Sequence, residues 1–549
     1  MLAPNYFAKF LALGSSLLAL GLAAHYSLPP LISRYIDTKI ALTPTSHSFP
    51  LWREPPVPIY QRFYFFNVSN AQEIEQRGQK PQLEQVGPFT YRSEWAKREL
   101  ERDEQRNTIS FKHVKRWHFE PELSVADHKM QLVTLNAPLA ITLTLIQSAS
   151  SAVRLLVTFS LDGLSDGFFT KRSVKQLLFD GYPDLLTTFG PLLNAEMLSQ
   201  GGHFGYMNAR NNSQDGAYEV NTGADQISKL NTINRFNGRT KLAYWQNQPP
   251  SCNSLDGATP GDLFPPIAHN ATTIKLFQPD FCRVWRLDSA AKLERESGLR
   301  VRRFKASRDI FRNSSDLPEN SCFFAGRRQH EQGPSAHTNR VHDGSRPPSR
   351  QGRNRPSQSA PEEQPAAGSG GGNSNNNNNN NRHHSHNRVR REWPAGVFTL
   401  APCKFNAPIY MSMPHFLDAD PYFLAQVEGL EPEASKHEFY LDVEPRTGSP
   451  VSLAARVQLN VAISKPPGLV RFRNVPEIMF PVFWQELSVN LTGPVIDQLV
   501  LASRGAQEAA QHIAYTLLLL GAAVLITTAL FYLQAKLAAL TGPKQLQDS

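Results

Sequence analysis

A short segment in the first half of the chain has the spacing of a hydrolase nucleophile. Gly163–Gly167 reads GLSDG and matches G-x-S-x-G, in which a sharp turn between a strand and a helix presents the serine, here Ser165. Strand-like residues precede this turn, but the helix-like residues begin several positions late. No glycine-rich segment for an oxyanion hole is evident, and Gly201–Phe204 (GGHF) is a poor substitute because it follows the serine. We interpret Gly163–Gly167 as a turn with a helix-capping Ser or Asp.

This interpretation predicts that the protein is not an enzyme, and a membrane-anchored serine hydrolase using Ser165 is the least favoured alternative. A metal centre is not expected either. His383–His386 (HHSH) has ligand-type side chains, but the biased composition of the tract around it is the simpler explanation. The cysteines form neither a CxxC pair nor a Cys/His zinc spacing. We therefore predict no cofactor and no metal.

The cysteines and the glycosylation sequons occupy the same part of the chain. The four cysteines are Cys252, Cys282, Cys322 and Cys403. They can pair in three ways, and pairing is the default in an oxidising compartment. The sequons begin at Asn67, Asn211, Asn270, Asn313 and Asn490. Both features indicate an extracellular or lumenal body.

Two apolar runs bracket that body. Residues 512–533 supply the ~20 apolar residues that a spanning helix needs, with Tyr515 and Tyr532 near the ends as interface anchors. Residues 10–32 follow Lys9 and fit an uncleaved anchor, which we favour, or a cleaved signal peptide. The predicted order is a cytosolic N-tail (1–9), a span (10–32), a body (33–511), a second span (512–533) and a cytosolic C-tail (534–549).

The net charge of +9 does not indicate a nucleic-acid partner, because most of it comes from one tract. Residues 327–391 contain eleven Arg, no Lys and four acidic residues, so they carry +7. They also contain seven consecutive asparagines and almost no apolar residues, which predicts a disordered insertion. RVRR at Arg388–Arg391 is typical of a site for secretory-pathway proteases, a hypothesis that stands beside that of a plain basic loop.

Residue patterns in the rest of the body predict an α+β fold. Phe63–Val68 has apolar side chains on both faces, which suits a strand buried on both sides. Leu453–Ser464 alternates apolar and polar residues, as a half-buried strand does. Ser173–Leu198 spaces its apolar residues three and four apart, which is typical of a helix.

Several long and idiosyncratic blocks run through the body in a set order. They are WREPPVPIYQRFYFFNVSN with QLEQVGPFTYR, then NTGADQISKLNTINRFNGRT with AYW, then PPIAHN through FQPDFCR, and finally APIYMSMPHFLDADP. These blocks resemble the class B scavenger receptor family and follow the family order across most of the body. The two-span topology is similar too, which favours an uncleaved anchor at residues 10–32.

The resemblance implies a fold and a disulfide pattern. The body would be an antiparallel β-barrel-like core that encloses a lipid tunnel and carries a helical apex bundle, here residues 141–205. The implied pairs are Cys252–Cys322 and Cys282–Cys403. The third bridge of the family is missing, because Phe324 stands where one of its cysteines is expected.

The resemblance also implies a cell-surface receptor that binds lipids, lipoprotein particles or anionic lipid surfaces and transfers lipid to the membrane. Such ligands need positive charge on the apex, and the candidates are Arg154, Lys171, Arg172 and Lys175. Singly, each is at least equally well explained as part of a solvated face. The sequence leaves the individual ligand and homo-oligomerisation open.

The alternative is a binding or sorting receptor, endolysosomal or for apoptotic cells, that transfers no lipid. The C-tail lacks the acidic dileucine signal of lysosomal relatives, and neither tail has a cysteine for palmitoylation. The expected location is therefore the plasma membrane, with an endosomal location as the alternative.

Overall fold

The computed structural model describes residues 4–162, 167–193, 202–245, 248–324, 326–327, 391–464 and 472–540. Residues up to Ala325 and from Trp393 onward form one compact unit, and Gly326–Glu392 form a second. In the second unit, β14 (Gly326–Arg327) pairs with β15 (Arg391–Glu392). Ser165, His383–His386 and nearly all of the predicted insertion lie outside the described residues.

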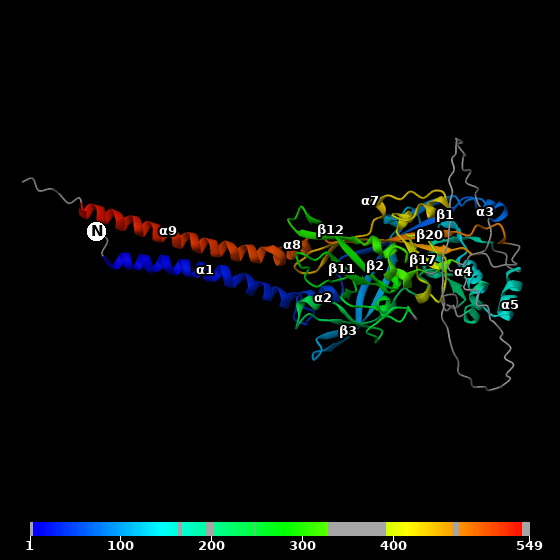
Figure 1. The fold of residues 1–549 in the computed structure, drawn as a ribbon, viewed down its shortest axis with the longest axis horizontal. Helices are drawn as coiled ribbons and strands as arrows, with labels where there is room; N and C mark the ends of the chain where they lie inside the picture. The colour runs from blue at the N-terminus through cyan, green and yellow to red at the C-terminus, as the bar shows by residue number, and fades with distance from the viewer. Residues whose placement is uncertain are drawn as a thin grey trace, which may run out of the picture. The chain divides into compact units, whose positions relative to one another are not determined.

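The first unit is built on one large sheet (Figure 1). Its strands are β1 (Ile59–Val68), β2 (Leu83–Asp103), β3 (Thr108–Phe119), β8 (Ser213–Asn221), β9 (Ile233–Phe236), β10 (Ala258–Thr259), β11 (Thr273–Phe277), β12 (Val284–Glu294), β13 (Arg300–Ala306), β16 (Phe398–Thr399), β17 (Ile409–Ser412), β18 (Tyr440–Val443), β19 (Pro450–Ala462) and β20 (Met479–Asn490). Two hairpins lie outside it: β4 (Gln131–Leu135) with β5 (Phe169–Ser173), and β6 (Tyr182–Pro183) with β7 (His203–Phe204).

The large sheet is nearly closed. Its strands follow the order β10-β11-β12-β13-β18-β19-β20-β1-β2-β3-β8-β9, with β17 and β16 attached at β19. The last strand of this path approaches the strand next to the first, where Phe236 of β9 packs edge-on against Phe277 of β11, with ring centroids 5.0 Å apart. Within the described strands, the pairings are antiparallel except for β10 with β11. The predicted α+β fold with a barrel-like antiparallel core is confirmed.

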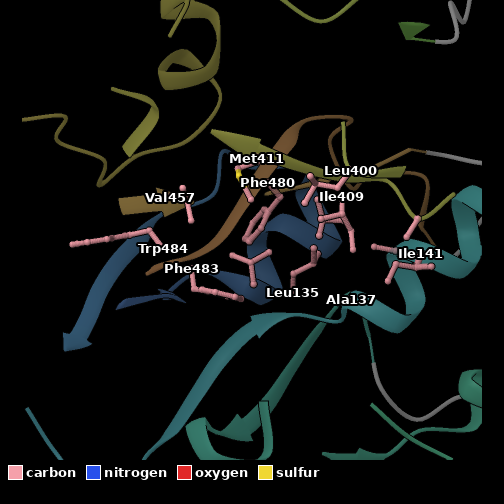
Figure 2. Packing of buried hydrophobic residues seen from close by; sticks show 14 of the residues in the cluster. Leu135, Ala137, Ile141, Leu400, Ile409, Met411, Val457, Phe480, Phe483 and Trp484 are labelled. Carbon is pink, nitrogen blue, oxygen red and sulfur yellow. The ribbon is translucent and has the colours of Figure 1, made fainter. Parts of the chain in front are cut away.

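Strand β1 is covered on both faces, as its aromatic run predicts. On one face Phe63 contacts Phe483 of β20, with ring centroids 5.9 Å apart. On the other face Phe66 contacts His415 at 5.3 Å. Figure 2 shows the surrounding core, in which Phe480 and Phe483 of the sheet belong to one buried cluster with Ile141 of the helix Ala137–Leu145.

The described helices are α1 (Pro4–Ile40), α2 (Ser48–Arg53), α3 (Ala71–Arg77), α4 (Ala137–Leu145), α5 (Ser151–Asp162), α6 (Pro421–Ala425), α7 (Ala434–His437), α8 (Pro494–Val500) and α9 (Ala506–Leu540). α1 and α9 are long and apolar enough to cross a membrane. They lie side by side (Figure 1), and Gly521 of α9 allows close approach, because a Cβ there would lie 2.8 Å from the backbone nitrogen of Leu18.

Ser173–Leu198 does not form one continuous helix. Its described part contains short helical turns, a π turn at Gln176–Asp180 and 3₁₀ turns at Leu185–Phe189 and Pro191–Leu193. Gly181 adopts a positive φ of 69° after the first turn, and Pro191 cannot donate a backbone hydrogen bond. The apolar residues spaced three and four apart therefore lie on separate short turns and not on one helix.

Ion pairs fix both long helices to the base of the sheet. Arg446, just before β19, donates to Asp37 at 2.7 Å and to the backbone oxygen of Ser33 at 2.7 Å. At the other helix, Arg504 contacts Glu294 of β12 at 3.2 Å. The base of the sheet is thus held beside the two helices that can span a membrane.

Candidate functional site

The interior of the large sheet contains three cavities that follow one another along β19. The apical cavity measures about 240 Å³, the middle cavity about 110 Å³ and the basal cavity about 160 Å³. Leu453 lines the basal and middle cavities, Ala455 the middle cavity, Val457 the middle and apical cavities, and Leu459 the apical cavity. Because side chains alternate along a strand, these four residues share the inner face.

Strand β20 runs antiparallel to β19 and shows the same order in reverse. Phe483 lines the apical cavity, and Gln485 lines both the apical and middle cavities. Leu487 lines the middle cavity, and Val489 and Leu491, the residue just after the strand, line the basal cavity. The lining residues of these two neighbouring strands thus give the three cavities the same spatial order.

Adjacent cavities share wall residues. The basal and middle cavities have Trp95, Gly261 and Leu453 in common. The middle and apical cavities have six residues in common: Gln61, Met207, Arg210, Asp280, Val457 and Gln485. Adjacent cavities therefore lie against the same residues, and we refer to the three together as the passage.

The two ends of the passage lie at different parts of the fold. The basal cavity is lined by Val495 and Leu499 of α8, which leads into α9, and by Trp52 of α2, which follows α1. The apical cavity is lined by Leu400 and Ile409, which lie in one cluster with α4 (Figure 2). The passage therefore runs from the cluster that contains α4 to α2 and α8, which adjoin the two helices that can span a membrane, α1 and α9.

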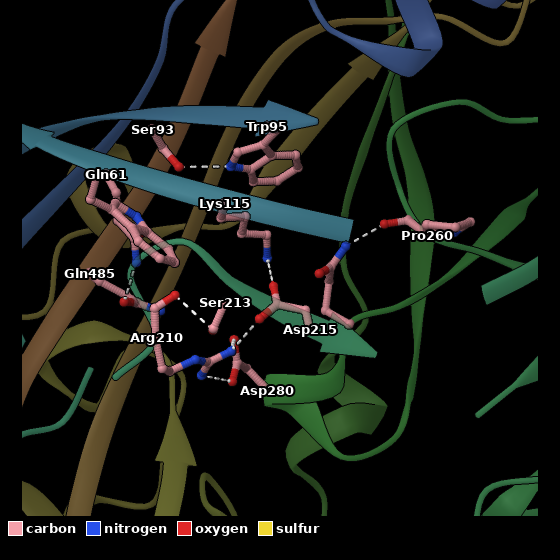
Figure 3. Close-up of polar contacts among 12 residues, drawn as sticks. Gln61, Ser93, Trp95, Lys115, Arg210, Ser213, Asp215, Pro260, Asp280 and Gln485 are labelled. Carbon is pink, nitrogen blue, oxygen red and sulfur yellow. Dashed lines mark hydrogen bonds and ion pairs between the residues drawn. The ribbon is translucent and has the colours of Figure 1, made fainter. Parts of the chain in front are cut away.

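A cluster of charged and amide side chains lies where the apical and middle cavities meet (Figure 3). We call it the polar waist, and its members are Gln61, Lys115, Arg210, Asp215, Asp280, Lys404 and Gln485. Gln61 donates to Gln485 at 2.8 Å and accepts from the indole of Trp117 at 2.8 Å. These amides therefore satisfy each other inside a largely apolar barrel.

The charged members of the waist form a chain of ion pairs. Lys115 contacts Asp215 at 2.5 Å, and Asp215 accepts from Arg210 at 2.9 Å. Both terminal nitrogens of Arg210 donate hydrogen bonds to the carboxylate of Asp280, at 2.5 and 3.3 Å. Lys404 lies 3.5 Å from the same carboxylate. Paired geometry of this kind is what makes buried charge tolerable.

The ion pairs keep the waist charged. Burial alone would raise the pKa of Asp280, but Arg210 and then Lys404 lower it well below its usual range. The pKa of Asp215 is also lowered, because Lys115 and Arg210 outweigh its burial and the repulsion from Asp280. The pKa of Arg210 is raised, chiefly by Asp280. Both carboxylates are therefore ionised at neutral pH.

Different elements position these side chains. Lys115 comes from β3 and Asp215 from β8, which pair as neighbours, and Arg210 lies in the turn before β8. Asp280 lies in a 3₁₀ turn two residues before Cys282, and Lys404 follows Cys403. The structure contains the disulfides Cys282–Cys403 and Cys252–Cys322, the pairs that the resemblance implies. The first of them ties the segments that carry Asp280 and Lys404.

The polar waist was not predicted from the sequence, although one signal for it was present. In β3 every second residue from Ile109 to Trp117 is buried, so His113 and Lys115 occupy the inward positions of the strand. A cation at an inward position is unusual unless it is paired. Its partners could not be read from the sequence, because Asp215 and Asp280 come from distant segments.

The four apex cations predicted as ligand contacts lie on α5 (Arg154), on β5 (Lys171 and Arg172) and just before the π turn Gln176–Asp180 (Lys175). Arg154 is on α5 and donates to the backbone oxygens of Gln147 and Ala149 at 3.3 Å. Arg172 stacks over Tyr182 at 4.7 Å, and Lys175 pairs with Asp180 at 2.9 Å. Lys171 on β5 is exposed.

The predicted glycosylation sites differ in their surroundings. Asn211, Asn270 and Asn490 are exposed, and Asn313 is half-buried. Asn67 is half-buried within β1, where its side-chain oxygen accepts from the backbone nitrogen of Val133 at 2.9 Å. Glycosylation at these five residues stays a prediction.

Two histidines are stacked in the core outside the passage. The rings of His415 and His437 lie 4.3 Å apart, and both residues are buried. Each Nδ1 accepts a backbone hydrogen bond, His415 from Glu431 at 2.9 Å and His437 from Glu433 at 3.0 Å. Burial and then His437 lower the pKa of His415 to about 3. Burial and then Arg456 lower the pKa of His437 to about 4.

Comparison of the sequence with known proteins identifies relatives of this chain. The CD36 family model matches residues 12–532. Scavenger receptor class B member 1 of Cricetulus griseus is 26% identical over 524 residues, which cover 94% of this chain and 87% of the relative. Lysosome membrane protein 2 of Homo sapiens is 29% identical over 471 residues, which cover 84% and 80%. Both names are those of receptors or membrane proteins.

The histidine pair predicts how stability depends on pH. Both folded-state pKa values lie below the ordinary 6.5, so their neutral forms stabilise the fold fully above about pH 6.5. That stability is lost as the pH falls toward 4 and 3, by up to about 1.4 kcal/mol per pH unit for each group. His437→Asn retains an acceptor for the backbone nitrogen of Glu433. We expect the melting temperature of this variant to fall less between pH 7.5 and pH 5.0 than that of the wild type.

The measurement is thermal unfolding of the purified full chain at both pH values. His269→Asn is the control, because His269 is exposed. Equal pH-dependent losses in wild type and His437→Asn would contradict the assignment.

Proposed function

Because the chain belongs to the CD36 family, we propose that it is a membrane receptor that captures lipids or lipid-carrying particles and passes lipid through the passage to the bilayer. The observation that carries the proposal is the shared order of the three cavities along β19 and β20. It gives a lipid one route from the apical helices to the side of α8 and α9.

The physical benefit of such a route is shielding from water. Exposing a lipid chain to water costs about 0.8 kcal/mol for each CH₂ group. The walls of the passage are largely apolar, with Leu453, Val457 and Leu487 on its inner face. Movement along these walls lowers the barrier without making or breaking a covalent bond.

The apex supplies the surface on which a particle would dock. Three side chains of α5 are largely exposed, Leu155 by 59%, Leu156 by 52% and Phe159 by 70%. Lys171 adds exposed positive charge on β5. Apolar side chains that insert among lipids, next to cations that attract anionic head groups, suit a lipid surface.

The proposed location is the plasma membrane, with the body outside the cell. A sorting receptor of acidic compartments is the second candidate, since one relative is named lysosome membrane protein 2. The buried pair of His415 and His437 supports the first location, because the stability contributed by their neutral forms declines as the pH falls below about 6.5.

Filling the middle cavity should stop transfer. Ala455 faces this cavity of about 110 Å³, so the ring of Ala455→Phe would occupy its space. We expect uptake of a fluorescent sterol from donor particles to fall about tenfold or more, because a closed passage forces the lipid through water. Uptake is measured in cells expressing the full chain and is normalised to surface-labelled protein.

The matched control is Ala290→Phe, in an exposed hollow lined also by Asp288 and Lys305, because Ala290 lines none of the three cavities. It should transfer lipid as the wild type does. Transfer by Ala455→Phe at the wild-type rate and equal surface level would contradict a route through the barrel.

Removing the apex charge should weaken docking while leaving the passage open. The variant replaces Arg154, Lys171, Arg172 and Lys175 with alanine. We expect binding of vesicles containing anionic lipid to fall several-fold, and binding of neutral vesicles to change little, because the lost attraction is electrostatic. Vesicle co-flotation at low and high salt measures this, with Lys292→Ala on β12 as a surface control. Equal loss for both vesicle types would count against charge-directed docking.

A further inference from the structure

We propose that residues 431–437 form an acid-released strap, which is closed against the outer face of the sheet at neutral pH and opens in acidic compartments. The inference goes beyond the proposed function, because none of these residues lines the passage. It is carried by the contacts of His415, which lies in the turn Pro414–Phe416, and of His437 at the end of α7.

The chain is fixed on both sides of the strap. Before it, the backbone of Glu428 bonds to the backbone of Pro81 and Leu83, at 2.8 and 3.0 Å. After it, the carboxylate of Glu438 pairs with Lys305 of β13 at 2.7 Å. The strap can therefore open between these points while both of its ends stay on the barrel.

The strap itself has few contacts with the sheet. Its side chains from 431 to 436 are exposed, and His437 is buried. The ring of His437 contacts that of Trp484 on the outer face of β20, with centroids 5.4 Å apart, and that of His415 at 4.3 Å. Arg456 of β19 also donates to the backbone oxygen of Ser435 at 3.3 Å. The stacked histidines, and not an apolar core, therefore hold the strap down.

Both histidines also accept hydrogen bonds from the backbone of the strap. Nδ1 of His415 accepts from Glu431 at 2.9 Å, and Nδ1 of His437 accepts from Glu433 at 3.0 Å. An imidazole that accepts at Nδ1 is neutral and carries its proton on Nε2, and Nε2 of His415 lies 2.6 Å from the side-chain oxygen of Gln85. Protonation turns each Nδ1 from an acceptor into a donor, so it breaks the bond to the strap.

The surroundings of the pair favour the neutral rings. The charged and titratable side chains around it are Arg62 and Tyr64 on β1, Arg456 on β19, Glu486 on β20, and Glu433 and Lys436 on the strap. Burial and then Arg456 lower the pKa of His437 to about 4, although Glu433 opposes them. Burial and then His437 lower the pKa of His415 to about 3. Two protonated rings in contact would also repel each other.

The turn that carries His415 is strained, which favours its rearrangement once the ring is released. His415, Phe416 and Asp418 have positive φ angles of 52°, 54° and 58°, a region that residues with side chains rarely adopt. The backbone nitrogen of His415 donates to the side chain of Gln458 at 2.7 Å, and its ring makes the bonds to Gln85 and Glu431. These three bonds hold the turn, and acid removes one of them.

The difference in pKa between the closed and open strap sets the size of the response. An open strap returns both histidines to the ordinary pKa of 6.5, so the neutral forms favour closure fully above about pH 6.5. This preference is lost as the pH falls toward 4 and 3. Between pH 7.5 and 5.0 the ratio of open to closed strap rises about 30-fold for each histidine and several-hundred-fold for both.

Hydrogen–deuterium exchange of the purified full chain in lipid nanodiscs tests the opening at pH 7.5 and 5.0. Protection factors are corrected for the intrinsic exchange rate at each pH. We expect the backbone amides of Glu431 and Glu433 to lose about a hundredfold or more of their protection at pH 5.0. The amides of β19 and β20 should keep theirs, which separates an opening of the strap from unfolding of the barrel.

Two variants assign the response to the histidines. His437→Asn and His415→Asn each retain an acceptor for the strap but leave one titrating ring, so the loss of protection should shrink to about 30-fold. Either variant suffices if the other lowers the protection of β19 and β20 at pH 7.5. The matched control is His269→Asn, which removes an exposed histidine and should behave as the wild type does.

Equal protection of the strap at both pH values in the wild type would overturn the inference. So would an undiminished loss of protection in the folded histidine variants, because another group would then drive the opening. Loss of protection across β19 and β20 together with the strap would also overturn it, since the barrel would then respond as a whole. None of these outcomes bears on lipid transfer, which Ala455→Phe tests separately.

Discussion

The alternation of side chains along β19 and β20 is the constraint on which the rest of the structure depends. Every second residue must point to the inside of the nearly closed sheet. On β19 these residues are Leu453, Ala455, Val457 and Leu459, none larger than leucine, and they leave space between opposite walls. A shift of one residue in register would turn Arg456 inward and the apolar side chains outward.

The polar waist sets a second requirement on that interior. Buried charges are tolerated only when they are paired, and the pairs here join segments far apart in sequence. Arg210 connects the turn before β8 to the turn that carries Asp280, and the Cys282–Cys403 disulfide brings Lys404 to the same carboxylate. Ion pairs and a disulfide therefore cross-link the protein where the apical and middle cavities meet.

Much of the fold could be predicted from the sequence because local patterns determine it. The aromatic run in β1 and the alternation in β19 follow from side-chain spacing, and the two apolar helices follow from the length of the apolar runs. Ser173–Leu198 was interpreted as helical from the same kind of pattern, and glycine and proline break its described part into separate turns. Spacing reports which face is buried, but not whether backbone breaks interrupt the helix.

The functional interior was harder to predict. The apex cations could be named as charged residues, yet only the structure shows that Arg154 and Lys175 already have partners within the protein. The polar waist was not predicted because its ion pairs join residues from distant segments, and a single sequence does not show which segments are in contact. Lys115 at an inward strand position was the one local sign of it.

Mapping a lipid along β19 tests the central claim, a continuous route inside the barrel, most directly. The full chain in nanodiscs would be labelled with a photoreactive sterol, and the modified residues identified by mass spectrometry of its peptides. A route inside the barrel predicts labels on the inward residues Leu453, Ala455, Val457 and Leu459, and none on Ala454 or Arg456. Labels confined to α1 and α9, or to outward residues of β19, would contradict it.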